Sequence, residues 1–566
     1  MLGERRNRTV AVDEADGDAA GAPVVARRGP RALRSLPSRP SLARPLLGRL
    51  TPAPGSAWRD PVTWTIAALV FGAYFVISLF RLLRLSPGSY DFGIYTEYVK
   101  QLSQLHAPIV DILAPGFNLL GNHFQVALAV LAPFFRVFPS PATLLFFQAL
   151  LTAVSIFPVV TAANAFTGKS TGRLIGFAYG FSWGLQQMID FDFHEIALAV
   201  PLLAFAVSAL VRRRPGAAIG WAMPLVFVKE DQGFTVAAIG VLLGVAAAFP
   251  RVVAYLPGTP ARPRPGFKDG LGDSRVALWG GLFLVAWGLF WSAFAIVVII
   301  PHFNPLHRYY FWGNGGVLGG GTSFSFRSLL TQAGGGWPTK AQTLVLLLLP
   351  TAFAALGSPV ALLALPSLLL RFISTNSAFW GTDFHYNATV MPILFIAAAE
   401  AIGRWRRARA LTWGASPGEA AGRGLAGRAR ELLRAAQGGL ARHGGAMMAA
   451  IAVALAFQFP LSSLWQATTY QLDAHVAADD AAMAVVPNGA TVQTTLDLLA
   501  PLAARTDTFW IGTKGNPLTR YIVFDGPDSG YSPAVTNVPR FIAQQYPGAG
   551  YVQVFDRDGV YVFRRG

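Results

Sequence analysis

Long apolar runs without charge, separated by short polar segments, occupy most of the chain between residues 62 and 465. Residues 62–80 contain no charged side chain, and neither do residues 276–301. About 20 apolar residues in a helix are enough to cross the hydrocarbon core of a bilayer. The pattern predicts eleven membrane-spanning helices, at residues 62–84, 142–166, 173–189, 195–211, 216–229, 232–249, 276–301, 340–356, 359–375, 387–403 and 445–465.

A further apolar segment, residues 124–138, does not fit this pattern. It contains Pro133 and Arg136, and at about 15 residues it is shorter than a membrane span needs to be. We interpret it as a re-entrant or interfacial helix. The fold class predicted for residues 61–465 is therefore an all-α polytopic membrane domain with about 11 transmembrane helices plus this short segment.

The two ends of the chain differ in character from the membrane region. Residues 1–60 are rich in Arg, Pro and Ala and have little to pack, which predicts a disordered tail. Residues 466–566 have the polarity of an ordinary soluble domain. Their pattern predicts a helix at 471–486 and strands at 490–494, 521–524 and 551–555. The pair Asp558-Gly559 predicts a hairpin turn after the last of these strands. A small C-terminal α/β domain outside the membrane is expected.

Charge supports the membrane interpretation and orients the chain. Only 13% of the residues are charged, and the formal net charge is +17. Eleven Arg precede residue 62 and nine lie between Arg404 and Arg442, beside predicted spans. Because basic residues that flank spans stay in the cytoplasm, this excess indicates topology rather than nucleic-acid binding. We expect a multi-pass protein of the cell membrane with a cytoplasmic N-terminus and an extracytoplasmic C-terminal domain.

Five short polar clusters mark the ends of predicted spans. All fall on the extracytoplasmic side of the predicted topology, at residues 90–92, 190–195, 229–231, 302–308 and 383–386. Ionisable side chains at membrane depth are costly, so they are functional candidates by default. Helix caps and solvated loop charges are the alternative explanation for each cluster taken singly. Their position on one side favours a single polar site.

Histidine and cationic residues gather on that side. Six of the eight His lie in predicted external segments, namely His106, His123, His194, His302, His307 and His385. Lys229 and Arg308 lie beside them. Such groups bind phosphate well, so we predict a cavity for an anionic group. The Gly-rich segment 313–336 lacks the Gly-Lys-Ser/Thr ending of a phosphate-binding loop and is interpreted as a flexible external loop.

A metal site is a further hypothesis. If the segment is extended, alternate side chains would place Asp190, Asp192 and His194 on one side. The chain has no Cys, which excludes disulfides and thiolate ligands. Any divalent cation bound here would take oxygen and imidazole ligands, as Mg²⁺, Mn²⁺ or Ca²⁺ can. Polar residues that end one helix and begin the next are the competing explanation, and no other cofactor is indicated.

Six motifs together carry a family resemblance: Tyr90-Asp91-Phe92-Gly93-Ile94, Gly121-Asn122-His123-Phe124, Phe138-Pro139-Ser140-Pro141, Phe191-Asp192-Phe193-His194-Glu195, Val228-Lys229-Glu230-Asp231 and His385-Tyr386-Asn387. They resemble an uncharacterised bacterial family of predicted membrane proteins, domain of unknown function 2079. The resemblance extends from about residue 64 to residue 566. That family resembles, more distantly, the C-type (GT-C) glycosyltransferases, which are polytopic enzymes that use polyprenyl-phosphate sugars.

The resemblance implies roles for individual residues. An acidic residue in the first external loop is the catalytic base of such enzymes, and Asp91 matches it. Candidates for binding the donor phosphate are Lys229, His302, His307 and Arg308. Candidates for the substrate pocket are Tyr90, His123, Asp192, His194, Glu195, Asp383, His385 and Tyr386.

The sequence thus favours a membrane glycosyltransferase that moves a sugar from a polyprenyl-phosphate donor to a cell-envelope glycan, lipid or protein. Its partners would be the lipid-linked sugar, membrane lipid and that acceptor. Two alternatives stay open. A transporter or flippase of lipid-linked or anionic solutes is one, although transporters place ionisable groups at mid-span and often carry internal repeats. A non-catalytic scaffold for envelope assembly is the other.

Overall fold

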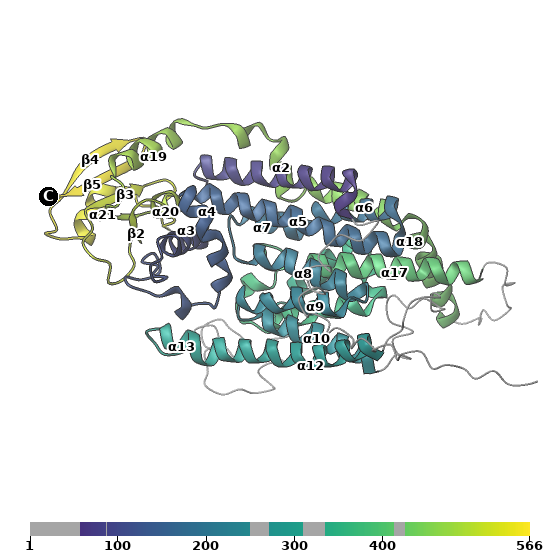
Figure 1. The fold of residues 1–566 in the computed structure, drawn as a ribbon. Helices are drawn as coiled ribbons and strands as arrows, with labels where there is room; N and C mark the ends of the chain where they lie inside the picture. The colour runs from purple at the N-terminus through teal and green to yellow at the C-terminus, as the bar shows by residue number, and fades with distance from the viewer. Residues whose placement is uncertain (1–56, 87, 249–270, 310–333, 413–424, 532) are drawn as a thin grey trace, which may run out of the picture. The chain divides into compact units, whose positions relative to one another are not determined.

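A computed structural model of the chain describes residues 57–86, 88–248, 271–309, 334–412, 425–531 and 533–566 (Figure 1). Most of the tail predicted at residues 1–60, and most of the Gly-rich segment 313–336, lie outside the described residues.

Helices form most of the described chain before residue 457 (Figure 1). They are α2 (Pro61–Leu83), α3 (Tyr90–Ser103), α4 (Ala132–Val137), α5 (Pro141–Thr167), α6 (Lys169–Gly180), α7 (Trp183–Asp190), α8 (Ile196–Val211), α9 (Pro215–Ala222), α10 (Gln232–Ala248), α12 (Leu271–Phe294), α13 (Ile300–Phe303), α15 (Trp337–Leu348), α16 (Leu365–Phe372), α17 (Val390–Thr412) and α18 (Leu425–Ala456).

Five helical stretches are long and apolar enough to cross a membrane, namely Pro61–Leu83, Pro141–Thr167, Ser274–Phe303, His385–Arg409 and Gly427–Ala456. They overlap the predicted spans at 62–84, 142–166, 276–301, 387–403 and 445–465, although the last stretch begins at Gly427 and ends at Ala456, before the predicted end of its span. The expectation of a mostly helical protein with several apolar spans is therefore confirmed.

The remaining predicted spans take shorter or broken forms. Shorter apolar helices cover the predictions at 195–211, 216–229, 232–249 and 359–375. The prediction at 173–189 is interrupted between α6 and α7, and that at 340–356 leaves the α-helix after Leu348. The segment at 124–138 forms a 3-10 helix, Val126–Leu131, followed by the six residues of α4. The count of eleven crossings stays a prediction.

The C-terminal region contains the expected sheet. It is five-stranded, in the order β2-β1-β3-β5-β4, with bounds β1 (Thr491–Thr494), β2 (Asp507–Trp510), β3 (Tyr521–Asp525), β4 (Tyr551–Arg557) and β5 (Val560–Arg565). β1 pairs in parallel with β2 and β3, whereas β5 pairs antiparallel with β3 and β4. The helices are α19 (Ala474–Val485), α20 (Leu499–Ala503) and α21 (Val538–Gln545).

Alternating side chains bury both faces of this sheet. Tyr521 and Val523 of β3 pack with α19, whereas Ile522 and Phe524 pack with α21, as the two-residue period of a strand requires. The predicted hairpin is confirmed as β4 and β5. Both turn residues, Asp558 and Gly559, have positive φ, at 48° and 84°, which is the geometry that favours Asp-Gly.

Helix α3 contacts the C-terminal region. The Tyr90 ring packs on Trp510 with ring centroids 4.6 Å apart, and the Lys100 ammonium donates to the Thr506 carbonyl at 2.6 Å. Sheet and helices belong to one compact unit, Pro54–Gly566. A domain boundary near residue 466 stays a prediction. Because Asp91 is in the first turn of α3, the contacts between α3 and the C-terminal region help to set its position.

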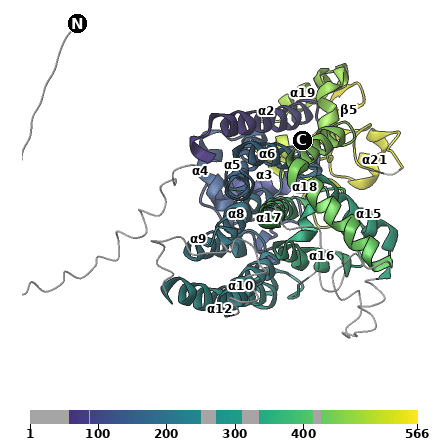
Figure 2. The ribbon, with the colours of Figure 1, turned by 90° about the vertical axis from the view of Figure 1, so that its right-hand side faces the viewer.

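Helices α10 and α12 lie side by side, as both views show (Figures 1 and 2). Glycines allow this approach. A Cβ atom at Gly240 would lie 2.5 Å from the Gly281 carbonyl oxygen, so only glycine fits there without a shift of the helices. Close contact through small residues is a common way to associate helices in a membrane. It also supports the loop before α10, because Ser292 donates to the Glu230 carbonyl at 2.6 Å.

We expect Gly240→Ala to destabilise the protein. The added methyl would overpack the α10–α12 contact, at a cost of about 1–3 kcal/mol. Gly244→Ala on the same helix is the matched control, since a Cβ there meets nothing within 4 Å. Thermal unfolding of the purified proteins measures the difference. Equal melting temperatures for the two variants would contradict the close approach.

The burial of Glu97 should make the free energy of unfolding depend on pH. Burial raises the pKa of Glu97 to about 8, although Lys100 acts to lower it, whereas an unfolded Glu has a pKa of about 4.3. The folded state therefore holds a proton that the unfolded state releases, and stability falls as pH rises from about 4 to about 8. This term is on the order of 2–5 kcal/mol.

Glu97→Gln should remove this term, because the amide can still accept the hydrogen bond that Ile112 N donates to Glu97 Oε2 at 3.1 Å. The melting temperature of the variant, measured at pH 6 and pH 8.5, should change less than that of the original protein. An equal change in both would show that Glu97 is ionised in the folded state.

Candidate functional site

One cavity of about 770 Å³ collects side chains from four of the five predicted polar clusters. The predicted site residues that line it are Asp91, His123, His194, Lys229, His385 and Tyr386. They come from segments as far apart as α3 and the turn before α17. Their roles in binding and catalysis stay predictions.

Asp91 lies in the first turn of α3 and its side chain is 36% exposed. Ser89 caps this helix, since its Oγ accepts a hydrogen bond from Phe92 N. The positive end of the helix dipole stabilises a carboxylate at this position. Asp91 Oδ2 lies 3.8 Å from His194 Nε2. Asp91 is therefore an accessible carboxylate beside an imidazole.

The segment between α7 and α8 turns sharply at Asp192, whose φ is +64°. Gln148 of α5 holds this turn, because its amide nitrogen donates to the Asp192 carbonyl at 2.6 Å and its amide oxygen accepts from His194 N at 3.0 Å. The turn separates the predicted cluster. Asp190 and Asp192 face Arg81, and His194 faces the cavity.

Glu195 is fully buried beneath the cavity wall and joins three segments. Its Oε1 pairs with Lys229 Nζ at 3.0 Å, and its Oε2 lies 2.7 Å from His194 Nδ1. The Tyr95 hydroxyl donates to the same Oε2. A buried carboxylate requires such partners, since an uncompensated charge costs several kcal/mol. Glu195 thus orients Lys229 and His194, and it is not itself part of the cavity lining.

His385 stacks on His194, with ring centroids 3.3 Å apart and planes 20° apart. It is 3% exposed, and neither of its ring nitrogens has a hydrogen-bond partner among the described residues. Buried polar groups are nearly always paired. Because His385 also lines the cavity, its imidazole is available to a bound group there.

Arg371 of α16 holds the turn that carries His385. Its guanidinium donates to the carbonyls of Phe379 and Tyr386 and to the side-chain oxygen of Asn387. The guanidinium also lies over the Tyr386 ring, 5.5 Å from the centroid. These contacts shape the wall of the cavity and bring a second buried cation to it.

His123 forms a separate pair at the cavity wall. Its Nδ1 lies 2.6 Å from Glu230 Oε1, which also accepts from the Tyr309 hydroxyl at 2.9 Å. Phe124 N donates to the other oxygen of Glu230 at 3.1 Å. Glu230 is buried. It therefore fixes His123 as Glu195 fixes His194.

The predicted metal set does not come together. Arg81 binds Asp190 at 3.1 Å and Asp192 at 3.3 Å, and Ser89 N donates to Asp192 Oδ2 at 2.8 Å. These contacts clamp the start of α3, which positions Asp91. The expected extended geometry is replaced by the left-handed turn at Asp192. Within the described part of the chain, a different group of His and Asp side chains, in the C-terminal region, is close enough to hold a metal ion.

Several other predicted residues lie away from the cavity lining. His302, His307, Arg308 and Asp383 are exposed. Asn304 anchors its turn by donating to the Gly121 carbonyl at 2.8 Å, with His302 before it and His307 and Arg308 after it in the chain. The Tyr90 hydroxyl donates to the Ile112 carbonyl at 2.9 Å, and its ring packs on Trp510. Tyr90 is thus a packing residue.

Three residues that the sequence reasoning missed, Tyr95, Gln148 and Arg371, shape the site. Tyr95 is four residues after Asp91, so the two share a face of α3. Gln148 and Arg371 are isolated polar residues within predicted spans. That isolation is the signal that would have found them, because polar groups at membrane depth are expensive.

Comparison with known proteins identifies a family. A family described as predicted membrane protein, DUF2079, matches residues 81–522. No curated protein matches the sequence. The fold resembles ArnT from Cupriavidus metallidurans bound to undecaprenyl phosphate, at 14% identity and a TM-score of 0.43, over 88% of this chain and 97% of that one.

It also resembles the archaeal oligosaccharyltransferase AglB from Archaeoglobus fulgidus, in complex with an inhibitory peptide and a dolichol-phosphate. The identity is 13% and the TM-score 0.34, over 88% of this chain and 74% of that one. A structure of an Archaeoglobus fulgidus oligosaccharyltransferase in complex with Zn and sulfate has 13% identity and a TM-score of 0.33, over 88% of this chain and 73% of that one. The family match makes the chain a multi-pass membrane protein.

Lys229→Met should destabilise the protein because it leaves Glu195 buried without its cation. Breaking a buried pair from one side costs about 3–5 kcal/mol. The double variant Lys229→Met/Glu195→Gln should recover much of that loss, since it removes the unpaired charge as well. Thermal unfolding of the single and double variants measures this coupling. If the double variant is no more stable than the single one, the pair does not stabilise the fold.

Proposed function

The chain belongs to the predicted membrane protein family DUF2079, and from that premise we propose that it is a glycosyltransferase of the cell membrane. It transfers a sugar from a polyprenyl-phosphate donor to a glycan, lipid or protein acceptor outside the cytoplasm. The observation that carries the proposal is the cavity, in which an accessible carboxylate, Asp91, lies beside a cluster of cationic and imidazole groups.

The cavity is suited to an amphipathic donor. Its polar wall is formed by the groups described above, and the rest of the lining includes Ile94, Leu119, Ile196, Phe234, Ile296, Leu370 and Phe379. A lipid-linked sugar has a charged head and an apolar chain, so it requires both kinds of wall. Mostly apolar lining with a few convergent polar groups is typical of ligand sites.

Asp91 is the proposed general base. The acceptor hydroxyl oxygen attacks the anomeric carbon, the bond from that carbon to the phosphate oxygen breaks, and the hydroxyl proton passes to the Asp91 carboxylate. The polyprenyl phosphate leaves with the electron pair. A positioned base commonly contributes 10²–10⁴-fold, on the order of several kcal/mol. His194 Nε2 lies 3.8 Å from Asp91 Oδ2, close enough to help orient the carboxylate.

Lys229 and His385 are proposed to hold the departing phosphate. An ammonium has three donors, and the pairing of Lys229 with Glu195 leaves donors to spare. His385 offers ring nitrogens that have no hydrogen-bond partner in the described part of the chain. Fixed cations aimed at developing charge lower the barrier more than mobile water does. His123 and Tyr386 line the same space and are candidates to contact the sugar.

The orientation follows from the basic residues. The Arg-rich tail and the segment 404–442 are placed in the cytoplasm by the positive-inside rule. The cavity and the C-terminal sheet then lie on the opposite side of the membrane. This orientation gives the enzyme access to envelope acceptors.

Asp91→Asn should abolish sugar transfer and leave folding intact. The amide keeps the shape of the side chain but cannot accept a proton, so kcat should fall by about 10²–10⁴ with little change in KM. The assay offers labelled polyprenyl-phosphate pentose or hexose to membranes that contain each version, and follows the sugar into envelope material. Thermal unfolding of the purified variant checks the fold.

Asp383→Asn is the matched control, because Asp383 is an exposed carboxylate that does not line the cavity. It should retain full transfer. Equal transfer by the original protein and Asp91→Asn would remove Asp91 as the base. If the original protein transfers no sugar from any donor, a transporter or flippase, or an assembly scaffold, becomes the better account.

A further inference from the structure

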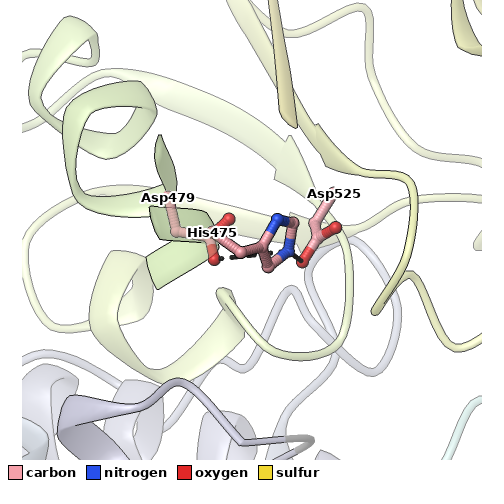
Figure 3. Close-up of side chains that lie close together, drawn as sticks. All are labelled: His475, Asp479 and Asp525. Atoms are coloured by element: carbon pink, nitrogen blue, oxygen red, sulfur yellow. Dashed lines mark hydrogen bonds and ion pairs between the residues drawn. The ribbon is translucent and has the colours of Figure 1, made fainter. Parts of the chain in front are cut away.

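A second cluster of ionisable residues lies in the C-terminal region, away from the cavity (Figure 3). It consists of His475, Asp479 and Asp525, whose potential ligand atoms all lie within 4.8 Å of one another. His475 Nε2 is 3.0 Å from Asp525 Oδ2 and 3.7 Å from Asp479 Oδ2. Two ligands of one ion, each about 2.0–2.2 Å from it, lie about 3.0–3.5 Å apart. The separations are close to that range.

The orientation of His475 is that of a metal ligand. Its Nδ1 lies 3.0 Å from the Asp558 carbonyl oxygen in the β4–β5 turn. A carbonyl can only accept, so Nδ1 carries a proton and donates it. In the neutral imidazole, Nε2 then has a lone pair directed at two carboxylates. Metal-binding histidines nearly always donate their other ring N–H to a carbonyl or carboxylate in this way.

The two carboxylates are also held in place. Asp525 is fully buried, and its Oδ1 accepts from Asp528 N at 3.2 Å, so Oδ2 is left to face His475. Asp479 is 1% exposed, and its Oδ1 has no hydrogen-bond partner among the described residues. An unpaired carboxylate oxygen in a buried position is costly. Figure 3 shows the Asp479 carboxylate directed toward the other two side chains.

The cluster lies near a further acidic residue at the same edge of the sheet. Asp525 ends β3, and Asp497 follows the parallel strand β1, so both lie at the carboxyl edge of the sheet. A divalent cation between these side chains would balance the charge of the two ligating carboxylates.

We propose that His475, Asp479 and Asp525 bind a divalent transition-metal cation, Zn²⁺ or Mn²⁺. An imidazole together with carboxylates favours these ions over Ca²⁺ and Mg²⁺, which prefer oxygen ligands alone. The site is independent of the proposed transfer reaction, and no residue of the cavity takes part in it. The bound ion joins the first turn of α19 to the end of β3, and through His475 to the hairpin turn. It therefore stabilises the C-terminal sheet.

The test uses the purified full-length chain after chelator treatment and dialysis. Mn²⁺ binding is measured by loss of the free-ion signal in electron paramagnetic resonance, and Zn²⁺ by competition. We expect one site with a dissociation constant in the micromolar range or below. Asp479→Asn should weaken binding at least tenfold. Asp480→Asn is the matched control, since it removes the same charge from the next, exposed residue of α19.

Thermal unfolding supplies the second measurement. Saturating metal should raise the melting temperature of the original protein and of Asp480→Asn, but not that of Asp479→Asn, because only a competent folded site gains from the ion. His475→Gln provides a second variant if Asp479→Asn fails to fold. Absence of binding in the original protein, or equal binding by Asp479→Asn and Asp480→Asn, would overturn the site and leave the cluster as an ion pair only.

Discussion

The buried carboxylate of Glu195 is the constraint on which the candidate site depends. Its three partners are Tyr95 of α3, the neighbouring His194, and Lys229 from the loop before α10. A buried charge is tolerated only when its partners are in place. The three segments therefore cannot separate without exposing or neutralising it, and this requirement holds Lys229 and His194 in the wall of the cavity that Asp91 also lines.

A second set of contacts sets the start of α3. Arg81 and Asp192 clamp the backbone at Ser89 from the membrane side, whereas Tyr90 and Lys100 bind the C-terminal region. Asp91 lies between these two anchors. The position of the proposed base is thus coupled to the C-terminal sheet, so a stabilised sheet, with or without a bound cation, bears on the geometry of the cavity.

Much of the site was predictable at the level of clusters but not of single residues. Span ends with ionisable residues indicated the segments that meet, and Asp91, His194, Lys229 and His385 do line one cavity. Within the 190–195 cluster, however, Asp192 has a left-handed backbone conformation. As a result, Asp190 and Asp192 pair with Arg81, whereas His194 lines the cavity. A backbone reversal of one residue is not encoded in the polar pattern. The same limit applies to His302, His307 and Arg308, which share the predicted side of the membrane but are exposed.

The sequence alone determined the features that depend on local composition. Uncharged runs must be helices where water is excluded, because only a helix satisfies its own backbone there, and Asp558-Gly559 specifies a hairpin turn. Tertiary structure alone decided which charges meet. The Glu195–Lys229 pair joins residues 34 positions apart, and the His475–Asp525 contact joins residues 50 positions apart. Pairing between residues so far apart in the sequence depends on how the helices and strands pack and on the cost of leaving a buried charge unpaired. Neither is a property of a local stretch of chain.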